Sequence, residues 1–201
     1  MQQQSPRVVM IGDASVGKTS LAYRLCKDTW NANFHPTVSA AFYILENKET
    51  DQKIQIWDTA GSEKYRAVNS VYYHNAMGGI LVFDLTERKS FDSLESWVNE
   101  FVGLAQPNAM LVIVGNKVDC LPQLQESPES DNIVNPSEAE LWAQQRNYKY
   151  FSTSALDGTN IKELANYLLE KMPQGQILNQ SSSIDIAHQR TDKDEKGGCC
   201  S

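Results

Sequence analysis

The residues with the most definite chemistry lie at positions 12–19, Gly-Asp-Ala-Ser-Val-Gly-Lys-Thr, and have the spacing GxxxxGK[ST]. Glycine permits a tight turn there, so backbone N–H groups can surround phosphate oxygens at the start of the following helix. Lys18 can bring a charge to the terminal phosphates, and the Thr19 hydroxyl can bind Mg²⁺. The alternative is a glycine-rich turn with an accidental Lys-Thr pair, which the flanking strand and helix patterns disfavour. The sequence therefore predicts a nucleotide phosphate site formed by Ala14, Ser15, Val16, Gly17, Lys18, Thr19 and Ser20.

Two further side chains can complete a magnesium site. Asp58 follows the apolar pattern that ends at Trp57, and a carboxylate there can hold Mg²⁺ through water, because this ion keeps several waters. Taken alone, Asp58 would be a cap or turn residue. Thr37 follows Pro36 in a segment without secondary-structure signals, and its hydroxyl can reach the metal only if that loop closes on the nucleotide; alone it would be a surface threonine. We expect Thr19, Thr37 and Asp58 to bind the metal.

The pattern Asn116-Lys117-Val118-Asp119 follows an apolar strand and indicates the choice of base. The Asp119 carboxylate can accept from the N1–H and 2-amino groups of guanine, and adenine lacks this pair of donors. After the last strand, backbone N–H groups of 154–156 can meet the guanine O6 atom. We therefore expect the base to be bound by Asn116, Lys117, Asp119, Ser154, Ala155 and Leu156.

Composition narrows the classes of function. The chain has 201 residues and a formal net charge of −7, so nucleic acid is not an expected partner, since phosphate backbones need a basic face. Its four cysteines do not form a disulfide scaffold and suit a reducing compartment. The first residues lack a signal-peptide core, and the longest apolar run, 76–83, is far below the roughly 18 residues of a spanning helix. We expect a cytosolic protein whose membrane contact is added chemically.

Short β-rich runs alternate with helical patterns along the chain. This alternation predicts an α/β fold: a six-stranded, mostly parallel sheet with one antiparallel hairpin strand and helices on both faces. Ligands bind such sheets beyond the carboxyl ends of the strands, where each motif above falls. The expected strands are 7–12, 41–45, 53–57, 78–85, 111–116 and 148–153.

Helical periodicity fills most segments between these strands. A helix is expected to follow the phosphate loop, a second to begin at Ser90 as its cap, and a last one to cover 161–169. Asn135-Pro136-Ser137 is expected to open another helix, with Ser137 and Glu140 at capping-box spacing.

Two segments do not fit the core. Residues 121–132 contain prolines, serines and acids without periodicity and are expected to form a surface loop. From about Pro173 the chain is polar and irregular, which indicates a flexible tail. We therefore expect a folded domain at 7–171 and a tail at 172–201.

The motifs GDASVGKT, HPTVSA, WDTAG, NKVD and TSA appear in the order and spacing of small Ras-like GTPases. KIQIWDTAG, VYYHNAMGGILVFDL and the terminal Cys-Cys pair resemble the Rab group, and the similarity covers roughly residues 7–171. The resemblance implies a P-loop GTPase fold and a GTP/GDP switch with Mg²⁺. It also implies that Lys18, Thr37 and Gly61 contact the γ-phosphate and act in catalysis, and that Trp30 lies against guanine. From the sequence alone, a packed core tryptophan is an equal alternative for Trp30.

Some positions depart from the family pattern. Position 62 usually carries a glutamine that orients the attacking water. Ser62 is roughly two bonds shorter and cannot reach the same point, so we expect slow intrinsic hydrolysis that depends on an activating protein. Leu156 replaces the usual lysine beside the base. The segments VSAAF and YYHNA match the Rab patterns IGVDF and YYRGA only in part.

The final residues, KGGCCS, resemble Rab geranylgeranylation sites, which implies lipid groups on Cys199 and Cys200. The alternative is a pair of free thiols on a disordered tail. Because acidic residues accompany the few basic ones in the tail, no polybasic patch can supply a second membrane signal, and we expect both cysteines to be needed.

The resemblance also implies a monomer on the cytosolic face of endomembranes that acts in vesicular trafficking. Its partners would be an exchange factor, a GTPase-activating protein, a prenyl-binding chaperone (a GDP-dissociation inhibitor) and effectors. Phe42, Trp57 and Tyr72 correspond to aromatics that form a partner-reading surface in the Rab group, and buried packing is their alternative role.

Two other functions compete with this interpretation. A nucleotide-bound interaction module with negligible hydrolysis, controlled by exchange or recruitment, is favoured by Ser62. A metabolic P-loop kinase or ATPase is disfavoured by the guanine pattern at 116–119 and would need a second substrate site.

Overall fold

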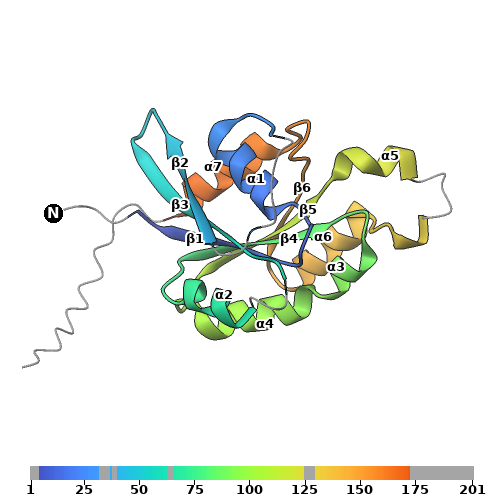
Figure 1. Cartoon of the computed structure of the whole chain (residues 1–201), viewed down its shortest axis with the longest axis horizontal. Coiled ribbons are helices and arrows are strands. Elements are labelled where there is room, and N and C mark those ends of the chain that lie inside the picture. Colours follow the sequence, from blue (N-terminus) through green and yellow to red (C-terminus); the bar gives the residue numbers. More distant parts are fainter. Residues whose placement is uncertain (1–4, 32–36, 38–39, 63–65, 125–129, 173–201) are drawn as a thin grey trace, which may run out of the picture.

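The computed structural model describes residues 5–31, 37, 40–62, 66–124 and 130–172. Its framework is a six-stranded sheet with the order β2-β3-β1-β4-β5-β6 (Figure 1). β2 pairs with β3 in an antiparallel manner, and all other neighbours pair in parallel. The predicted α/β architecture is confirmed. The strands are β1 (Arg7–Ile11), β2 (Ala40–Asn47), β3 (Gln52–Thr59), β4 (Gly78–Asp84), β5 (Met110–Asn116) and β6 (Lys149–Ser152).

Helices cover both faces of the sheet (Figure 1). α1 (Lys18–Lys27) and α7 (Ile161–Lys171) lie on one face. The opposite face is covered by α2 (Arg66–Tyr73), α3 (Arg88–Asp92), α4 (Leu94–Leu104) and α6 (Pro136–Gln145). A short helix, α5 (Leu121–Leu124), follows the 3₁₀ turn Val118–Cys120. The longest described helices have 11 residues, and none in this part of the chain combines the length and apolar character needed to span a bilayer.

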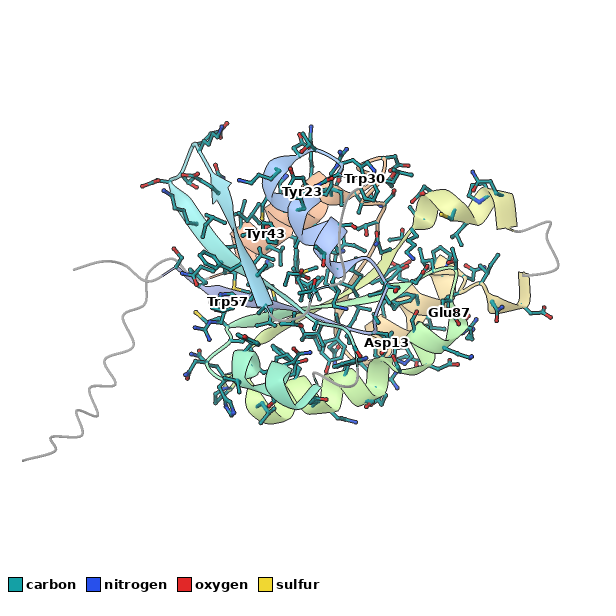
Figure 2. All side chains as sticks on the ribbon, in the orientation of Figure 1. Asp13, Tyr23, Trp30, Tyr43, Trp57 and Glu87 are labelled. Atoms are coloured by element: carbon teal, nitrogen blue, oxygen red, sulfur yellow. The ribbon has the colours of Figure 1, made fainter. Side chains whose placement is uncertain are left out.

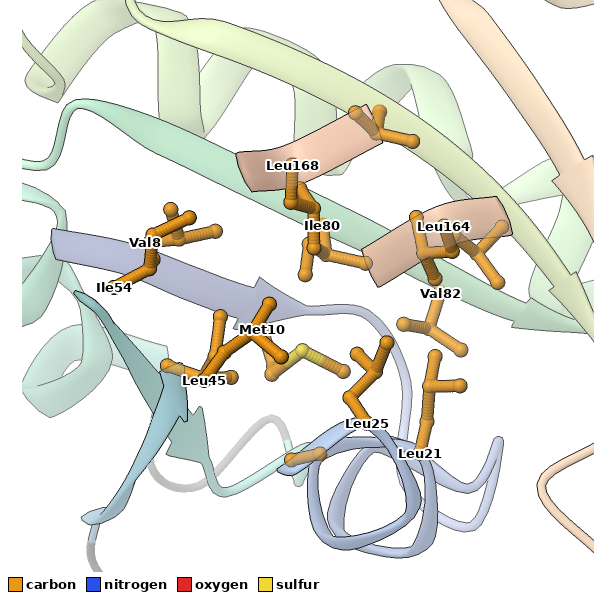
Figure 3. Packing of buried hydrophobic residues seen from close by; sticks show 14 of the residues in the cluster. Val8, Met10, Leu21, Leu25, Leu45, Ile54, Ile80, Val82, Leu164 and Leu168 are labelled. Atoms are coloured by element: carbon orange, nitrogen blue, oxygen red, sulfur yellow. The ribbon is translucent and has the colours of Figure 1, made fainter. Parts of the chain in front are cut away.

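Successive side chains of the central strands pack alternately into two separate apolar clusters, one on each face of the sheet. In β1, Val8 and Met10 point into one apolar cluster, whereas Val9 and Ile11 point into the other. All seven residues of β4 are buried, as expected for a strand covered on both faces. Figure 3 shows the first cluster, in which strand residues meet α1 and α7 through Leu21, Leu25, Leu164 and Leu168. The sheet is therefore a rigid base for the loops at its carboxyl edge.

Two predicted helix caps are wrong. Ser90 lies inside α3, where its Oγ accepts from the Asp84 N–H at 3.0 Å and donates to the Glu87 carbonyl at 2.7 Å. The predicted single helix is in fact two, which break at Ser93. At α6 the cap is Asn135, whose side chain accepts from the Ser137 N–H, with proline in the first turn.

No helix was predicted at α2, which follows the segment around Gly61. Residues 121–132 are not simply a loop, because Leu121–Leu124 is helical, Leu121 is buried and Ser130–Asn132 forms a 3₁₀ turn. Residues 125–129, like the predicted tail beyond Met172, lie outside the described residues.

Candidate functional site

The loop between β1 and α1 has the form expected for holding phosphate. It leaves the buried strand at Ile11 and returns at Lys18, the first residue of α1. Gly17 occupies the N-cap in the left-handed region with φ 95°, and a Cβ at this position would collide with Asn116 Nδ2. The cap offers no side-chain hydrogen bond to the helix, and its first turn carries no acidic residue. An anionic ligand can therefore accept from the first amides of α1.

Lys18 is held under this loop. It is only 5% exposed, and its Nζ donates to the carbonyl oxygens of Gly12 at 2.9 Å and Asp13 at 2.6 Å. Burial lowers the pKa of Lys18 to about 8, against the opposing charges of Asp58 and Asp13. A phosphate brought next to the ammonium group would restore its charged form.

Three side chains from separate elements meet beside the start of α1. Thr19 Oγ1 donates to Asp58 Oδ2 at 2.7 Å and lies 2.8 Å from Thr37 Oγ1. Thr37 Oγ1 is also 3.1 Å from the same carboxylate oxygen. The second oxygen, Asp58 Oδ1, is buried and has no hydrogen-bond partner among the described residues. Burial raises the pKa of Asp58, although the Thr19 hydrogen bond and the Lys18 charge oppose the shift.

This set of oxygens fits Mg²⁺. Two hydroxyls and one carboxylate are a small, hard, oxygen-only donor set, and Mg²⁺ uses few protein ligands beside phosphate and water. The orphaned Asp58 Oδ1 is the kind of buried acceptor that a metal-bound water can satisfy. In the part of the chain described, no group of three His, Cys, Asp or Glu side chains forms a rival metal site.

The residues predicted to bind the base gather at the ends of β5 and β6. Asn116 Nδ2 donates to the Val16 carbonyl at 2.9 Å, and its Oδ1 accepts from the Ala155 N–H at 3.3 Å. Asn116 therefore ties the phosphate loop to the segment at 154–156. Lys117 adopts φ 65° and pairs with Asp84 at 2.6 Å. Asp119 follows in the 3₁₀ turn and is partly exposed.

Other predicted base contacts lie more openly. Ser154 and Ala155 are buried, whereas Leu156 is 51% exposed. Trp30 is 42% exposed, so the alternative that it is a packed core residue is wrong; its contact with guanine stays a prediction. Ser20 is the third residue of α1 and is half-buried.

Gly61 lies where the loop after β3 meets the phosphate loop. A Cβ on Gly61 would collide with both Lys18 Nζ and the Asp13 carbonyl oxygen, so only glycine allows this approach. Asn69 of α2, which is buried, donates to the Ala60 carbonyl at 2.5 Å and holds the preceding residue in place. Ser62 is half-buried beside it.

The aromatic residues expected to read partners form a continuous stack. The ring of Trp57 lies 5.7 Å from that of Phe42 and 5.6 Å from that of Tyr72. Phe42 is 59% exposed, so buried packing is wrong for this residue. Trp57 and Tyr72 are half-buried and pack in part against the second apolar cluster. Cys199 and Cys200 lie outside the described residues.

The structure adds site residues that sequence reasoning missed. A cavity of about 460 Å³ adjoins the phosphate loop and Gly61, and α3, α4 and the end of β4 form its other wall. Asp13 and Glu87 line it and lie near one another at this edge of the sheet (Figure 2). The Asp13 carboxylate accepts from Ser93 Oγ and Trp97 Nε1, both at 2.8 Å. Only the apolar spacing of Trp97 was visible in the sequence, and it predicted a core role.

The sequence is similar to proteins of the Ras family, including proteins of the Rab group. The Ras family model matches residues 7–174. The chain is 40% identical to the Ras-related protein RABA4d of Arabidopsis thaliana over 160 residues, which cover 78% of this chain and 68% of that protein. It is 33% identical to the GTP-binding protein ypt3 of Schizosaccharomyces pombe over 96% of this chain and 95% of that one. It is 36% identical to the Ras-related protein Rab-3 of Caenorhabditis elegans over 82% and 72%. The chain therefore belongs to the Ras family, as a Rab-like small GTPase.

Proposed function

We propose that this GTPase is a Mg²⁺-dependent GTP/GDP switch whose two loops around Thr37 and Gly61 respond to the γ-phosphate. The observation that carries the proposal is the meeting of Thr19, Thr37 and Asp58 next to buried Lys18. Thr19, Thr37 and, through water, Asp58 would hold the metal. Bound Mg²⁺ would neutralise charge on the β- and γ-phosphate oxygens.

Each loop would sense the terminal phosphate through one residue. Lys18 supplies a positive charge from below the phosphate loop, and Gly61 brings the backbone after β3 against it. Thr37 comes from a different segment, and its hydroxyl lies beside Thr19 and Asp58, where the metal would join it to the γ-phosphate. A γ-phosphate would favour the closed arrangement of both loops, and its loss would release them.

Guanine selectivity would come from the ends of β5 and β6. Asp119 would accept from the two guanine donors, the N–H groups of 154–156 would meet O6, and Asn116 would hold the two regions together. Trp30 and Leu156, both exposed, are available to cover the base.

Intrinsic hydrolysis would be slow. The position after Gly61 carries Ser62, whose short side chain cannot place a water where the family glutamine does. An activating protein can supply the missing groups, and a single arginine from such a partner is worth about 10³–10⁵ in rate. The alternative is an interaction module with negligible hydrolysis, in which exchange or recruitment sets the signal; Ser62 is the observation that favours it.

Membership of the Rab group supports a role in vesicular trafficking on the cytosolic face of endomembranes. The half-exposed stack of Phe42, Trp57 and Tyr72 would bind effectors, exchange factors or activating proteins. Geranylgeranyl groups on Cys199 and Cys200 would anchor the protein, and a GDP-dissociation inhibitor would carry the lipidated form. Membrane recovery in cells of Cys199→Ser/Cys200→Ser at the native level would contradict the lipid anchor.

The test of the central function is competition for bound fluorescent GDP in the presence of Mg²⁺. We expect GTP to displace the probe at concentrations about 10⁴-fold lower than ATP, because a site built to hydrogen-bond a ligand rejects analogues that leave its polar groups unpaired. Asp119→Asn should lose GDP affinity, whereas Asp92→Asn, an exposed aspartate on α3, serves as the matched control. Equal displacement by ATP and GTP would contradict a guanine-nucleotide switch and favour the kinase or ATPase alternative.

A further inference from the structure

We propose that Ser93 and Trp97 are positioning residues, which grip the Asp13 side chain and so fix the phosphate loop for the terminal phosphates. The inference rests on the proposed nucleotide-binding function and adds a set of residues on α4 that determines phosphate affinity. Asp13 is visible on the α4 side of the sheet edge in Figure 2.

The two contacts occupy both oxygens of one carboxylate. Trp97 Nε1 donates to Asp13 Oδ1 at 2.8 Å, and Ser93 Oγ donates to Asp13 Oδ2 at 2.8 Å. The donors are 84 and 80 residues away from Asp13 in the sequence. Hydrogen bonds to a charged group are the stronger kind, and two of them also fix the orientation of the carboxylate.

The position of these donors on α4 is specific. Ser93 and Trp97 are four residues apart, so their side chains project from the same face of the helix. Ser93 is the N-cap residue of α4, but its hydroxyl makes no cap hydrogen bond to that helix. It lies within reach of Asp13 and of the Ser90 carbonyl, 3.0 Å away. Trp97 is 3% exposed, so packing holds its indole N–H in one direction.

The peptide of Asp13 touches both groups that would sense the γ-phosphate. Its carbonyl oxygen accepts from Lys18 Nζ at 2.6 Å. The same oxygen is one of the atoms that a Cβ on Gly61 would strike. Whatever fixes Asp13 therefore fixes the spacing between Lys18 and Gly61. In the part of the chain that the structure describes, Ser93 and Trp97 hold the Asp13 carboxylate from α4.

Charge gives a second reason for the grip. Asp13 is an acid within a loop that binds anions, and a carboxylate free to swing toward the phosphates would repel them. The two donors on α4 hold the negative charge against that helix instead. Removing the donors, rather than the acid, is therefore the informative change, since Asp13→Asn would remove the repulsion together with the contact.

The experiment measures GDP and GMP affinities by displacement of fluorescent GDP from the full chain with Mg²⁺. The variants are Trp97→Phe, which keeps a ring and loses the N–H group, and Ser93→Ala. Trp142→Phe is the matched control, because Trp142 lies on α6 and packs on Phe91 in the same apolar cluster, with ring centroids 6.1 Å apart. Thermal unfolding of each variant reports its stability.

We expect each donor variant to bind GDP about tenfold more weakly, the loss typical of one hydrogen bond to a charged group, and GMP less than about twofold more weakly. Discrimination between GDP and IDP, which depends on the base, should not change. Trp142→Phe should keep the native ratio of GDP to GMP affinity.

The inference would be overturned if both donor variants kept the native ratio of GDP affinity to GMP affinity. It would also be overturned if GDP and GMP affinity fell by the same factor and that fall followed the loss of thermal stability. If Trp97→Phe does not fold, Ser93→Ala alone gives the answer, because its hydroxyl makes no cap hydrogen bond to α4. If the native chain binds no GDP, the proposed function fails and this inference fails with it. If the native chain binds GDP and only the predicted effect of the variants is missing, the inference alone fails.

Discussion

Thr19 and Asp58 lie 39 residues apart in the sequence, yet the Thr19 hydroxyl donates to Asp58 Oδ2 at 2.7 Å. The contact joins the first turn of α1 to the end of β3. It leaves Asp58 Oδ1 as a buried oxygen without a partner in the described chain. Because burial raises the pKa of Asp58, a cation at this point would stabilise its charged form.

Replacement of Thr19 by alanine should weaken magnesium binding. The change removes one oxygen of the proposed metal site and one hydrogen bond to Asp58. We expect the Mg²⁺ concentration needed to slow GDP release to rise by at least about tenfold, the loss seen even for outer-sphere partners of metals. Stopped-flow release of fluorescent GDP over a magnesium titration measures this. Thr19→Ser, which keeps the hydroxyl, should behave like the native chain; equal curves for Thr19→Ala and the native chain would contradict the site.

Gly61→Ala should impair the response to the γ-phosphate. The added Cβ would strike Lys18 Nζ and the Asp13 carbonyl, so the backbone must move away from the phosphate loop. We expect single-turnover hydrolysis to fall about a hundredfold, as for a displacement of about 1 Å at a reacting group. Binding of GDP should change far less than binding of a non-hydrolysable GTP analogue.

Gly103→Ala is the matched control for that variant. Gly103 lies in α4, and nothing lies within 4 Å of a Cβ built on it. Alanine there should stabilise the protein by about 0.5–1 kcal/mol through helix propensity, with hydrolysis unchanged. Comparable loss of hydrolysis in both variants would show that the Gly61 effect is not local.

Binding of GDP should depend on pH through Lys18. Burial lowers the pKa of Lys18 from 10.5 to about 8. Between pH 8 and pH 10.5 the unfolded chain binds more protons at Lys18 than the folded chain does, so the free energy of unfolding rises with pH in this range. Below pH 8 the folded chain bears the full cost of the buried charge. Phosphate favours the charged form, so binding above pH 8 takes up a proton.

The expected result is a GDP affinity about tenfold weaker at pH 9 than at pH 7, since about a tenth of Lys18 stays protonated one unit above its pKa. Calorimetry in buffers of different ionisation enthalpy measures both the affinity and the proton uptake. GMP is the control, because it shares the guanine, which also titrates in alkaline solution, and lacks the terminal phosphate. An identical pH dependence for GDP and GMP would exclude Lys18 as the cause.

Much of this fold follows from local sequence patterns. All six strands were predictable because each is a short apolar or alternating run beside a turn, and the apolar run of β4 correctly indicated burial on both faces. The residues that cap the helices were harder to predict than the strands. Ser90 has the residue type of a cap, but it is buried inside α3 and bonds the end of β4, which is a tertiary contact.

The positions of two motifs in the fold were predictable from residue type and spacing: the loop at 12–19 lies between β1 and α1, and the pattern at 116–119 lies at the end of β5. The site was not predictable where a side chain acts through a distant partner. Nothing near Asp13 in the sequence indicates its contacts with Ser93 and Trp97, because the fold alone brings α4 to the phosphate loop. The exposure of Trp30 could not be predicted from the sequence either, since tryptophan occurs both in cores and on binding surfaces.

The central claim is that this chain binds GTP as a switch but has lost its own means of positioning water at residue 62. Single-turnover hydrolysis with Mg²⁺ tests it for the native chain, Ser62→Gln and Ser62→Ala, each with and without a Rab-type activating protein. We predict slow hydrolysis by the native chain and Ser62→Ala, at least about tenfold faster hydrolysis by Ser62→Gln, and strong acceleration of the native chain by the partner. Native hydrolysis as fast as that of Ser62→Gln without a partner would contradict the claim, and a native chain that stays inert with the partner would favour the interaction module.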